Sequence, residues 1–399
     1  MRDRAEFFSD LLVGAVVAAL LLPAAYAAGL ERVNVTEKGS VLIFPKVELR
    51  WNNAGDTLLQ DTFISITNDY SRDVSVLVYL VSETCVWRLN DILLTRNEPA
   101  WWSAYTGQPK GVSPFTILGD PYDDPEDPGP NPELVLRGFV VAFAYDDPDT
   151  PDNVEAEICW NHLTGEATIV NYAQGFAWEY HAYAFAAMEC AEGRALGTPG
   201  ELHFDGVEFD YAFDRLLLDF IATGSEAFSN QGGPQTVTHD TDLTMLIVDL
   251  DLTQGGLPPI TKARFSIWNE NEVSFSGMTY CVTKWEQVLL GTLGGHFLVE
   301  NLHTDKGKAW INGVDGDAEC CAPGEDCSDY HALLGVAAKF LDLDGDGKAD
   351  LVAGDHLVGT GTEEATLYFE PPENPSPVQV DTGVEKLTPH SDGSLGLKP

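Results

Sequence analysis

Short strand-like segments, broken at close intervals by turn residues, constrain the fold of this chain more than any other feature. Residues 63–67 alternate apolar and polar side chains, 74–81 are rich in β-branched residues, and 138–145 are a short apolar run. Glycine (37 residues) and proline (23 residues) separate such segments. Long helical periodicity is missing, and 213–222 is the best candidate for a short helix. The pattern predicts an all-β protein of the β-sandwich class.

Two parts of the chain carry the same succession of motifs. The strand and turn at 63–68 (FISITN) have a counterpart at 264–269 (RFSIWN), and each is followed by a second strand and a cysteine. An internal duplication of this kind predicts two related β-sandwich domains, at 34–224 and 236–368. The glycine- and serine-rich residues 224–240 are interpreted as a linker between them.

The chain is strongly acidic. It has 63 aspartates and glutamates against 22 lysines and arginines, a formal net charge of −41. Nucleic acids and anionic membrane surfaces attract basic proteins, so this charge argues against both as partners. The negative charge favours solubility at high salt. It also attracts cations and would attract a basic protein partner. Residues 369–399 are predicted to be a disordered acidic tail.

The first residues have the layout of a secretory signal. Two arginines precede an apolar run at 11–22, and Ala25-Tyr26-Ala27 provides a small-residue cleavage site. A membrane anchor is the alternative, because the apolar stretch reaches about 18 residues if 23–28 are counted. We expect cleavage of residues 1–27, which leaves a protein without a membrane span that is secreted or held at the cell surface.

The seven cysteines are expected to form disulfides for the most part, because exported proteins mature in an oxidising compartment. The duplication suggests that each domain ties an early strand to a late one. This interpretation gives the pairs Cys85–Cys159 and Cys281–Cys327. It leaves the pairing of the other three cysteines open.

Several segments carry a resemblance to a known family. Residues 38–49, 61–70 and 160–185 resemble exported bacterial proteins that are mainly uncharacterised, which open with a K-G-x-x-L-x-F/Y strand followed by an I-x-N strand and turn. Residues 261–277 and 296–309 look like the second half of longer members. The shared motifs are structural, so the resemblance implies an exported β-protein and transfers no activity or catalytic residue.

One segment has the spacing of a calcium-binding loop. Carboxylates at relative positions 1, 3, 5 and 9, with glycine at 6 and a backbone carbonyl at 7, can surround one Ca²⁺; the residues are Asp342, Asp344, Asp346, Lys348 and Asp350. An EF-hand has glutamate at position 12, where this chain has Ala353. The segment therefore resembles the D-x-D-G-D-G-x-x-D loops of integrin-type sites, which lie between two strands. We expect a structural Ca²⁺ here, and a solvated acidic turn is the alternative.

Aromatic residues give a second set of candidates. Trp101 and Trp102 would stack on sugar rings if they are exposed, and would be ordinary core residues if they are buried. Trp178, His181 and Tyr183 belong to one aromatic strand whose polar groups could contact a small ligand. Both sets are candidate ligand-binding residues, and a plain strand edge is the alternative for the second.

Motifs for nucleophilic catalysis and phosphate binding are missing from the sequence, which favours a protein that is not an enzyme. The sequence predicts an exported, calcium-stabilised β-sandwich protein that binds a ligand or assembles outside the cytoplasm. Self-assembly as a surface-layer or filament subunit is one form of that role. The alternative is a secreted carbohydrate-binding protein or glycan-active hydrolase.

Overall fold

The computed structural model describes residues 38–369 with short gaps, together with 388–389 and 395–396. The gaps lie at 128, 146–156, 189–190, 199, 231–232, 253–258, 276, 315–319, 321–330, 346 and 370–387. The predicted signal segment and most of the predicted tail therefore lie outside the described residues. Among the residues described, no helix is long and apolar enough to cross a membrane.

The described elements are almost all strands, which confirms the predicted all-β class. Residues 38–200 contain β1 (Val41–Trp51), β2 (Leu58–Asn68), β3 (Val74–Ser82), β4 (Trp87–Leu94), β5 (Glu98–Ser103), η1 (Phe115–Leu118), β6 (Tyr122–Asp123), β7 (Leu134–Tyr145), β8 (Leu163–Asn171), β9 (Phe176–His181) and β10 (Tyr183–Phe185).

The rest of the chain continues in the same way, with single helical turns between strands. Its elements are β11 (Glu201–Phe204), β12 (Arg215–Ile221), β13 (Gly224–Asn230), β14 (Gly233–Ile247), β15 (Leu250–Asp251), β16 (Ile260–Asn269), β17 (Met278–Thr283), β18 (Trp285–Leu289), α2 (Leu290–Leu293), η2 (Gly295–Phe297), α3 (Val299–Leu302), β19 (Lys306–Val314), β20 (Leu333–Asp342), β21 (Leu351–His356), β22 (Val358–Thr360), β23 (Ala365–Tyr368), β24 (Thr388–Pro389) and β25 (Leu395–Gly396).

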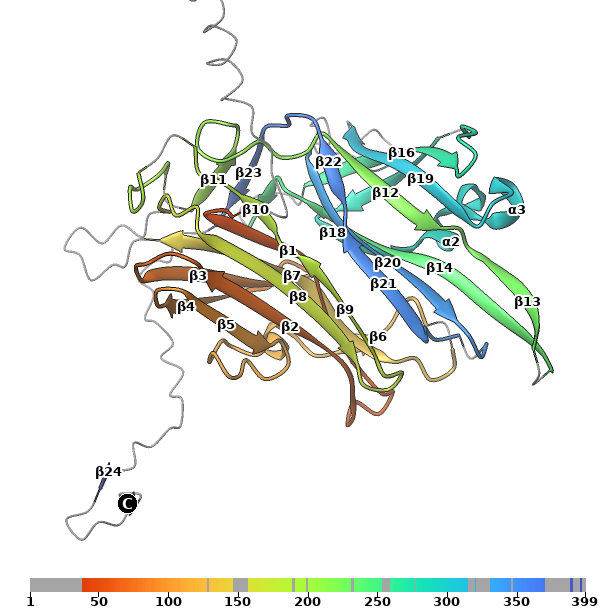
Figure 1. Cartoon of the computed structure of the whole chain (residues 1–399), viewed down its shortest axis with the longest axis horizontal. Helices are drawn as coiled ribbons and strands as arrows, with labels where there is room; N and C mark the ends of the chain where they lie inside the picture. Colours follow the sequence, from red (N-terminus) through yellow and green to blue (C-terminus); the bar gives the residue numbers. More distant parts are fainter. Residues whose placement is uncertain are drawn as a thin grey trace, which may run out of the picture.

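Strands β1 to β10 form a 10-stranded sheet that folds back on itself. One layer has the order β4-β3-β7-β1, and the other consists of β5, β2, β8 and β9. The layers are joined where Arg50 and Trp51 of β1 pair with the start of β2. Ile64, Ile169 and Val78 belong to the apolar core that the two layers enclose. This half of the molecule is a sandwich (Figure 1).

The layer β4-β3-β7-β1 is covered on both faces. Alternate residues of β1 contribute to different cores: Leu42 and Phe44 to the core of the first sandwich, and Val41 and Ile43 to a second core that extends through the rest of the chain. β3 and β7 divide their side chains in the same way. Burial on both faces explains why these strands read as continuous apolar runs in the sequence.

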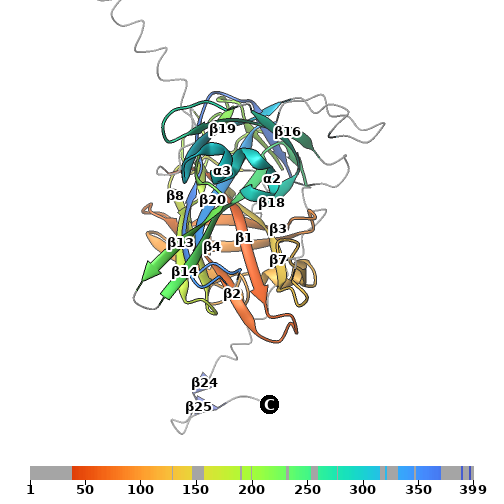
Figure 2. The ribbon, with the colours of Figure 1, turned by 90° about the vertical axis from the view of Figure 1, so that its right-hand side faces the viewer.

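The second half contains two five-stranded sheets and a small three-stranded one. Their strand orders are β17-β16-β19-β12-β22, then β13-β14-β20-β21 with β18 on β14, and β11-β23-β15. β11 pairs with β23 and β12 pairs with β19 and β22, so residues 201–221 complete sheets of the second half. The two halves lie against each other over a continuous core (Figures 1 and 2).

Two local predictions are wrong. Residues 213–222 form no helix: Arg215–Ile221 is strand β12, whose side chains alternate between exposed and buried. Residues 224–240 are no linker, because 224–230 and 233–247 form the antiparallel hairpin β13–β14. In both segments, pairing with neighbouring strands outweighs a local composition that suits other structures.

The two copies of the duplicated motif adopt the same structure at the turn that follows the strand. Asn68 and Asn269 both end a strand, are buried, and accept hydrogen bonds from the backbone N–H two residues further on. The following strands differ, since β17 pairs with β16 whereas β3 joins the layer opposite β2. The likeness between the two halves is therefore clearest in this strand and turn.

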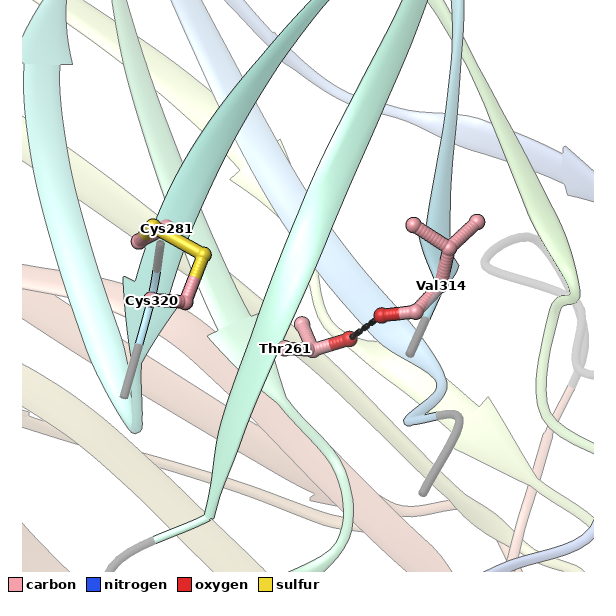
Figure 3. The surroundings of a disulfide bond; sticks show 4 residues. All are labelled: Thr261, Cys281, Val314 and Cys320. Carbon is pink, nitrogen blue, oxygen red and sulfur yellow. Dashed lines mark hydrogen bonds between the residues drawn. A yellow bond between two sulfur atoms is a disulfide. The ribbon is translucent and has the colours of Figure 1, made fainter. Parts of the chain in front are cut away.

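The disulfide prediction is wrong in both pairs. Cys281 on β17 is bonded to Cys320, with their Cα atoms 5.3 Å apart, and Cys327 lies outside the described residues (Figure 3). β19 is only two strands from β17, which brings the chain beyond Val314 near Cys281. Cys159 takes part in a disulfide that does not include Cys85. Cys85 carries a buried thiol, and this burial raises its pKa.

Candidate functional site

The predicted calcium loop connects two paired strands. β20 ends at Asp342, β21 begins after Asp350, and Leu341 pairs directly with Leu351. This confirms the strand–loop–strand setting. Carboxylate oxygens of Asp342, Asp344 and Asp350 lie within 4.8 Å of one another. Asp346, the fourth predicted carboxylate, lies outside the described residues.

Backbone amides hold the first of these carboxylates in place. Asp342 is buried and accepts hydrogen bonds from the amides of Gly345 (2.6 Å) and Gly347 (3.0 Å) and from the hydroxyl of Thr238 (3.2 Å). Burial alone would raise the pKa of Asp342, but these donors hold it below its ordinary value. The Lys348 side chain leaves the loop and forms an ion pair with Glu133. Its backbone carbonyl is the part that the calcium prediction uses.

A cavity of about 350 Å³ lies beside this loop, between the two halves of the molecule. Gly347, Lys348 and Ala349 of the loop form part of its wall. Trp178 and Phe340 add aromatic surface to the wall. Its charged lining comes from β1, β14 and the segment before β7, and includes Lys46, Glu48, Arg50, Asp124, Glu126 and Asp242.

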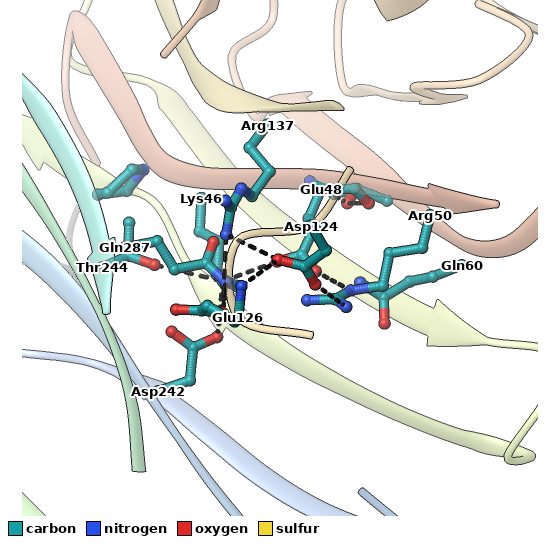
Figure 4. Close-up of polar contacts among 12 residues, drawn as sticks. Lys46, Glu48, Arg50, Gln60, Asp124, Glu126, Arg137, Asp242, Thr244 and Gln287 are labelled. Atoms are coloured by element: carbon teal, nitrogen blue, oxygen red, sulfur yellow. Dashed lines mark hydrogen bonds and ion pairs between the residues drawn. The ribbon is translucent and has the colours of Figure 1, made fainter. Parts of the chain in front are cut away.

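The charged lining belongs to a buried ion network that we call the inter-sheet charge cluster (Figure 4). Its members are Lys46, Glu48, Arg50, Asp124, Glu126, Arg137 and Asp242. The Lys46 ammonium lies 2.9 Å from a Glu48 oxygen and 3.0 Å from an Asp242 oxygen, and only 3% of its side chain is exposed. Because Asp242 lies on β14, these contacts join the two halves.

The arginines complete the cluster on the side of the first half. Arg50 forms an ion pair with Glu48 and donates to Asp124 at 2.6 Å, and Arg137 lies 3.6 Å from a Glu126 oxygen. Three cations thus face four carboxyl groups, so full ionisation would leave one negative charge buried and unpaired. Burial, with the charge of Asp242, raises the pKa of Glu126 to about 8. Glu126 therefore keeps its proton at neutral pH.

A β-bulge aims Lys46 into the cluster. The register of β1 against β7 shifts between Phe44 and Val47, so that two residues of β1 lie opposite one residue of β7. The Tyr180 hydroxyl caps the bulge: it accepts a hydrogen bond from the amide of Lys46 at 3.0 Å and donates one to the carbonyl of the same residue. Burial raises the pKa of Tyr180, so the capping phenol stays protonated.

This cluster was not predicted from the sequence, although the sequence contains a signal for part of it. Lys46, Glu48 and Arg50 occupy every second position of an otherwise apolar strand, which places three charged side chains on one face. In a chain with 22 basic residues, two of them on one buried strand are informative. The partner Asp242 is distant in the sequence and has no such signal.

Trp101 and Trp102 are adjacent residues of β5, so their side chains point to opposite faces of the sheet. Trp101 is 50% exposed, whereas Trp102 is completely buried in the first sandwich. Trp102 therefore belongs to the core and contacts no ligand at the surface. Trp101 remains a candidate, and the ring of Phe63 lies next to it with centroids 6.2 Å apart.

The three residues of the predicted ligand site around His181 also differ in their exposure to solvent. Tyr183 is fully buried, and its hydroxyl bonds the backbone of Gly335 and Leu357, which ties β10 to the second half. Trp178 packs on β21, where a Cβ added to Gly354 would lie 1.9 Å from the indole ring. Both side chains thus join the two halves, although Trp178 also lines the cavity. His181 is exposed beside Glu166.

Trp101 and His181 nevertheless share one sheet face. In the layer of β5, β2, β8 and β9, Trp101 pairs with Ser65, Ser65 with Glu166, and Glu166 with His181. Directly paired residues point to the same side of a sheet, so these four side chains form a row across the outer face. The row combines an exposed indole with hydroxyl, carboxylate and imidazole groups.

No protein-family model and no curated protein matches the sequence. Among solved structures, the chain is similar to a Parabacteroides distasonis protein described as secreted, with 9% identity, a TM-score of 0.17, and 80% of this chain and 94% of that chain covered. It is also similar to the CupB6 tip adhesin from Pseudomonas aeruginosa, with 11% identity, a TM-score of 0.12, and 84% and 94% covered. TM-scores this low establish no shared function, and the resemblance to exported bacterial proteins stays a prediction.

Replacing Lys46 should destabilise the whole protein. In Lys46→Met, Glu48 and Asp242 lose their shared cation while they stay buried, which costs about 3 to 5 kcal/mol of unfolding free energy. Urea unfolding measures the loss. The matched control is Lys339→Met, whose surface pair with Asp219 is worth at most about 1 kcal/mol. Equal losses in the two variants would contradict the role given to the cluster.

The proton on Glu126 should make stability depend on pH. Its pKa is about 8 in the folded protein and 4.5 without the protein environment, so between these values the folded state holds a proton that the unfolded state has released. Stability therefore falls as the pH rises from about 5 to 8. Glu126→Gln carries no titrating proton, and its unfolding free energy should fall less steeply. Parallel pH profiles from urea unfolding would contradict the assignment.

Proposed function

We propose that this chain is an exported, calcium-stabilised β-sandwich protein with a binding role outside the cytoplasm. The observation that carries the proposal is the convergence of the Asp342, Asp344 and Asp350 carboxylates between two paired strands. Export is supported by the signal layout of residues 1–27. The cavity next to the loop is the place we propose for a small ligand.

Electrostatics supports a cation in the loop. Carboxylates within 4.8 Å of one another repel unless a proton or a cation neutralises them. The pKa of Asp342 lies below its ordinary value, so a proton on this residue does not supply that neutralisation. The donor set is all oxygen, which suits Ca²⁺. Since the loop forms part of the cavity wall, a bound ion would also fix the shape of the binding site.

Calcium should raise the melting temperature of the protein. At about 100 times the dissociation constant, binding adds about 2.7 kcal/mol of stability, which corresponds to a rise of roughly 4 °C for a cooperative unit of this size. Asp344→Asn should abolish this rise. Because Asp344 is exposed, the variant should fold and, without calcium, melt no lower than the wild type. Calorimetry with calcium or a chelator makes the comparison.

The control for this experiment is Glu179→Gln, which neutralises an exposed carboxylate on β9 on the opposite side of the strand from Trp178. It should keep the full response to calcium. A wild-type melting temperature that is the same in calcium and in chelator would disprove calcium stabilisation. Loss of the response in Glu179→Gln would show that overall charge, and not the loop, is responsible.

A second candidate function is carbohydrate binding on the outer face of β5, β2, β8 and β9. The observation that favours it is the row of Trp101, Ser65, Glu166 and His181, next to Phe63. An exposed indole stacks on sugar rings, and the polar groups beside it can bond sugar hydroxyls. An open sheet face suits an extended chain better than a small molecule.

A glycan array with the mature protein tests this candidate. Trp101→Ala should weaken binding to any glycan found by at least about tenfold, because stacking on the ring contributes more than 1.4 kcal/mol. Tyr368→Ala removes an exposed aromatic residue on β23, in the other half of the molecule, and should leave binding unchanged. The absence of any glycan hit, or equal losses in the two variants, would exclude the sheet face as the binding surface.

A further inference from the structure

A second group of metal-ligating side chains lies next to the start of the calcium loop, on the opposite face of the sheet formed by β14 and β20. Glu226 is on β13, His239 is on β14, and Asp305 lies between α3 and β19. One ligand atom from each lies within 4.8 Å of the others. Gly224 pairs directly with His239 in the β13–β14 hairpin, which makes Glu226 a diagonal neighbour of the histidine on the same sheet face.

The hydrogen bond of His239 defines which nitrogen is available. The side chain is buried, at 6% exposure, and its Nδ1 lies 2.6 Å from the carbonyl oxygen of Ala222. A carbonyl only accepts, so Nδ1 carries the hydrogen and the neutral ring has its lone pair on Nε2. Metal-binding histidines are fixed in this way, by a backbone carbonyl that accepts from the other ring nitrogen.

The same buried residue also positions the second ligand. The amide of Ala222 donates to the backbone carbonyl of Asp305 at 2.9 Å, so both Asp305 and His239 are attached to one rigid point. Gly224 makes room for the imidazole, because a Cβ built there would lie 3.1 Å from His239 Cε1 and 2.7 Å from a methyl group of Val299. Because Gly224 has no side chain, the hairpin leaves space for the histidine ring at this position.

The donor set differs from that of the calcium loop. One imidazole nitrogen and two carboxylates suit zinc and similar divalent transition metals, whereas Ca²⁺ takes oxygen ligands. Glu226 is half-buried and Asp305 is exposed, so small rotations of their side chains can bring the oxygens to bonding distance. With three protein ligands, the remaining coordination positions would be held by water.

We propose that Glu226, His239 and Asp305 bind a divalent transition metal of the zinc class. The proposal is independent of the calcium loop and of the ligand cavity. It gives the β13–β14 hairpin a role beyond strand pairing, since the metal would fasten the hairpin to the turn before β19.

Cobalt(II) is the probe, added to the full mature protein saturated with calcium so that the Asp342 loop is occupied. The wild type should bind one Co²⁺, with a visible absorption band of nitrogen–oxygen coordination, and Zn²⁺ should displace it. His239→Asn keeps a donor for the Ala222 carbonyl but removes the ligand nitrogen, and should weaken binding at least tenfold. Glu226→Gln, a second variant, should do the same.

His303→Asn is the matched control. It removes an exposed imidazole two residues from Asp305, and asparagine tolerates the left-handed backbone at that position (φ 60°). Its Co²⁺ affinity should equal that of the wild type. The proposal is overturned if the wild type binds Co²⁺ no better than His239→Asn and Glu226→Gln do, or if His303→Asn loses binding. Unfolding curves without metal confirm that each variant is folded.

Discussion

The burial of Lys46 between β1 and β14 is the constraint on which the arrangement of the two halves depends. A lysine ammonium can be desolvated only where carboxylates surround it, and Glu48 and Asp242 do so from β1 and β14. Burial alone would lower the pKa of Lys46, but these two charges raise it, so the group stays charged. Separation of the halves would break the Lys46–Asp242 ion pair.

Direct hydrogen bonds repeat this connection around the bulge in β1. The indole of Trp285 donates to the carbonyl of Pro45 at 2.7 Å, next to the lysine, and Tyr183 bonds the backbone of β20 and of the β21–β22 turn. Both use a polar tip on a large apolar side chain, which satisfies backbone groups that the bulge and the strand ends leave free. The cavity lies beside these contacts, so its walls are held by both halves together.

Local sequence patterns predict those elements of the fold that depend only on neighbouring residues. The apolar runs 74–81 and 138–145 were recognisable as strands, and the spacing of aspartates from Asp342 to Asp350 predicted a loop between two strands. Two other properties depend on residues far apart in the sequence. Trp102 is buried because another layer of strands covers it. Cys281 is bonded to Cys320 because the strand order brings the two residues together. The charge cluster combines residues up to about 200 positions apart, and no short-range pattern specifies such a meeting.

The acidic composition makes neutralisation a general problem for this chain, and the structure meets it in different ways. With 22 basic residues for 63 acidic ones, lysine and arginine can balance only selected sites, and three of them are concentrated in the inter-sheet cluster. Even there a proton on Glu126 has to complete the balance. Carboxylates also converge at Asp342, Asp344 and Asp350, where we propose that a dissolved cation supplies the positive charge. If cations fill this role as proposed, the stability of the protein is coupled to the ions of its surroundings.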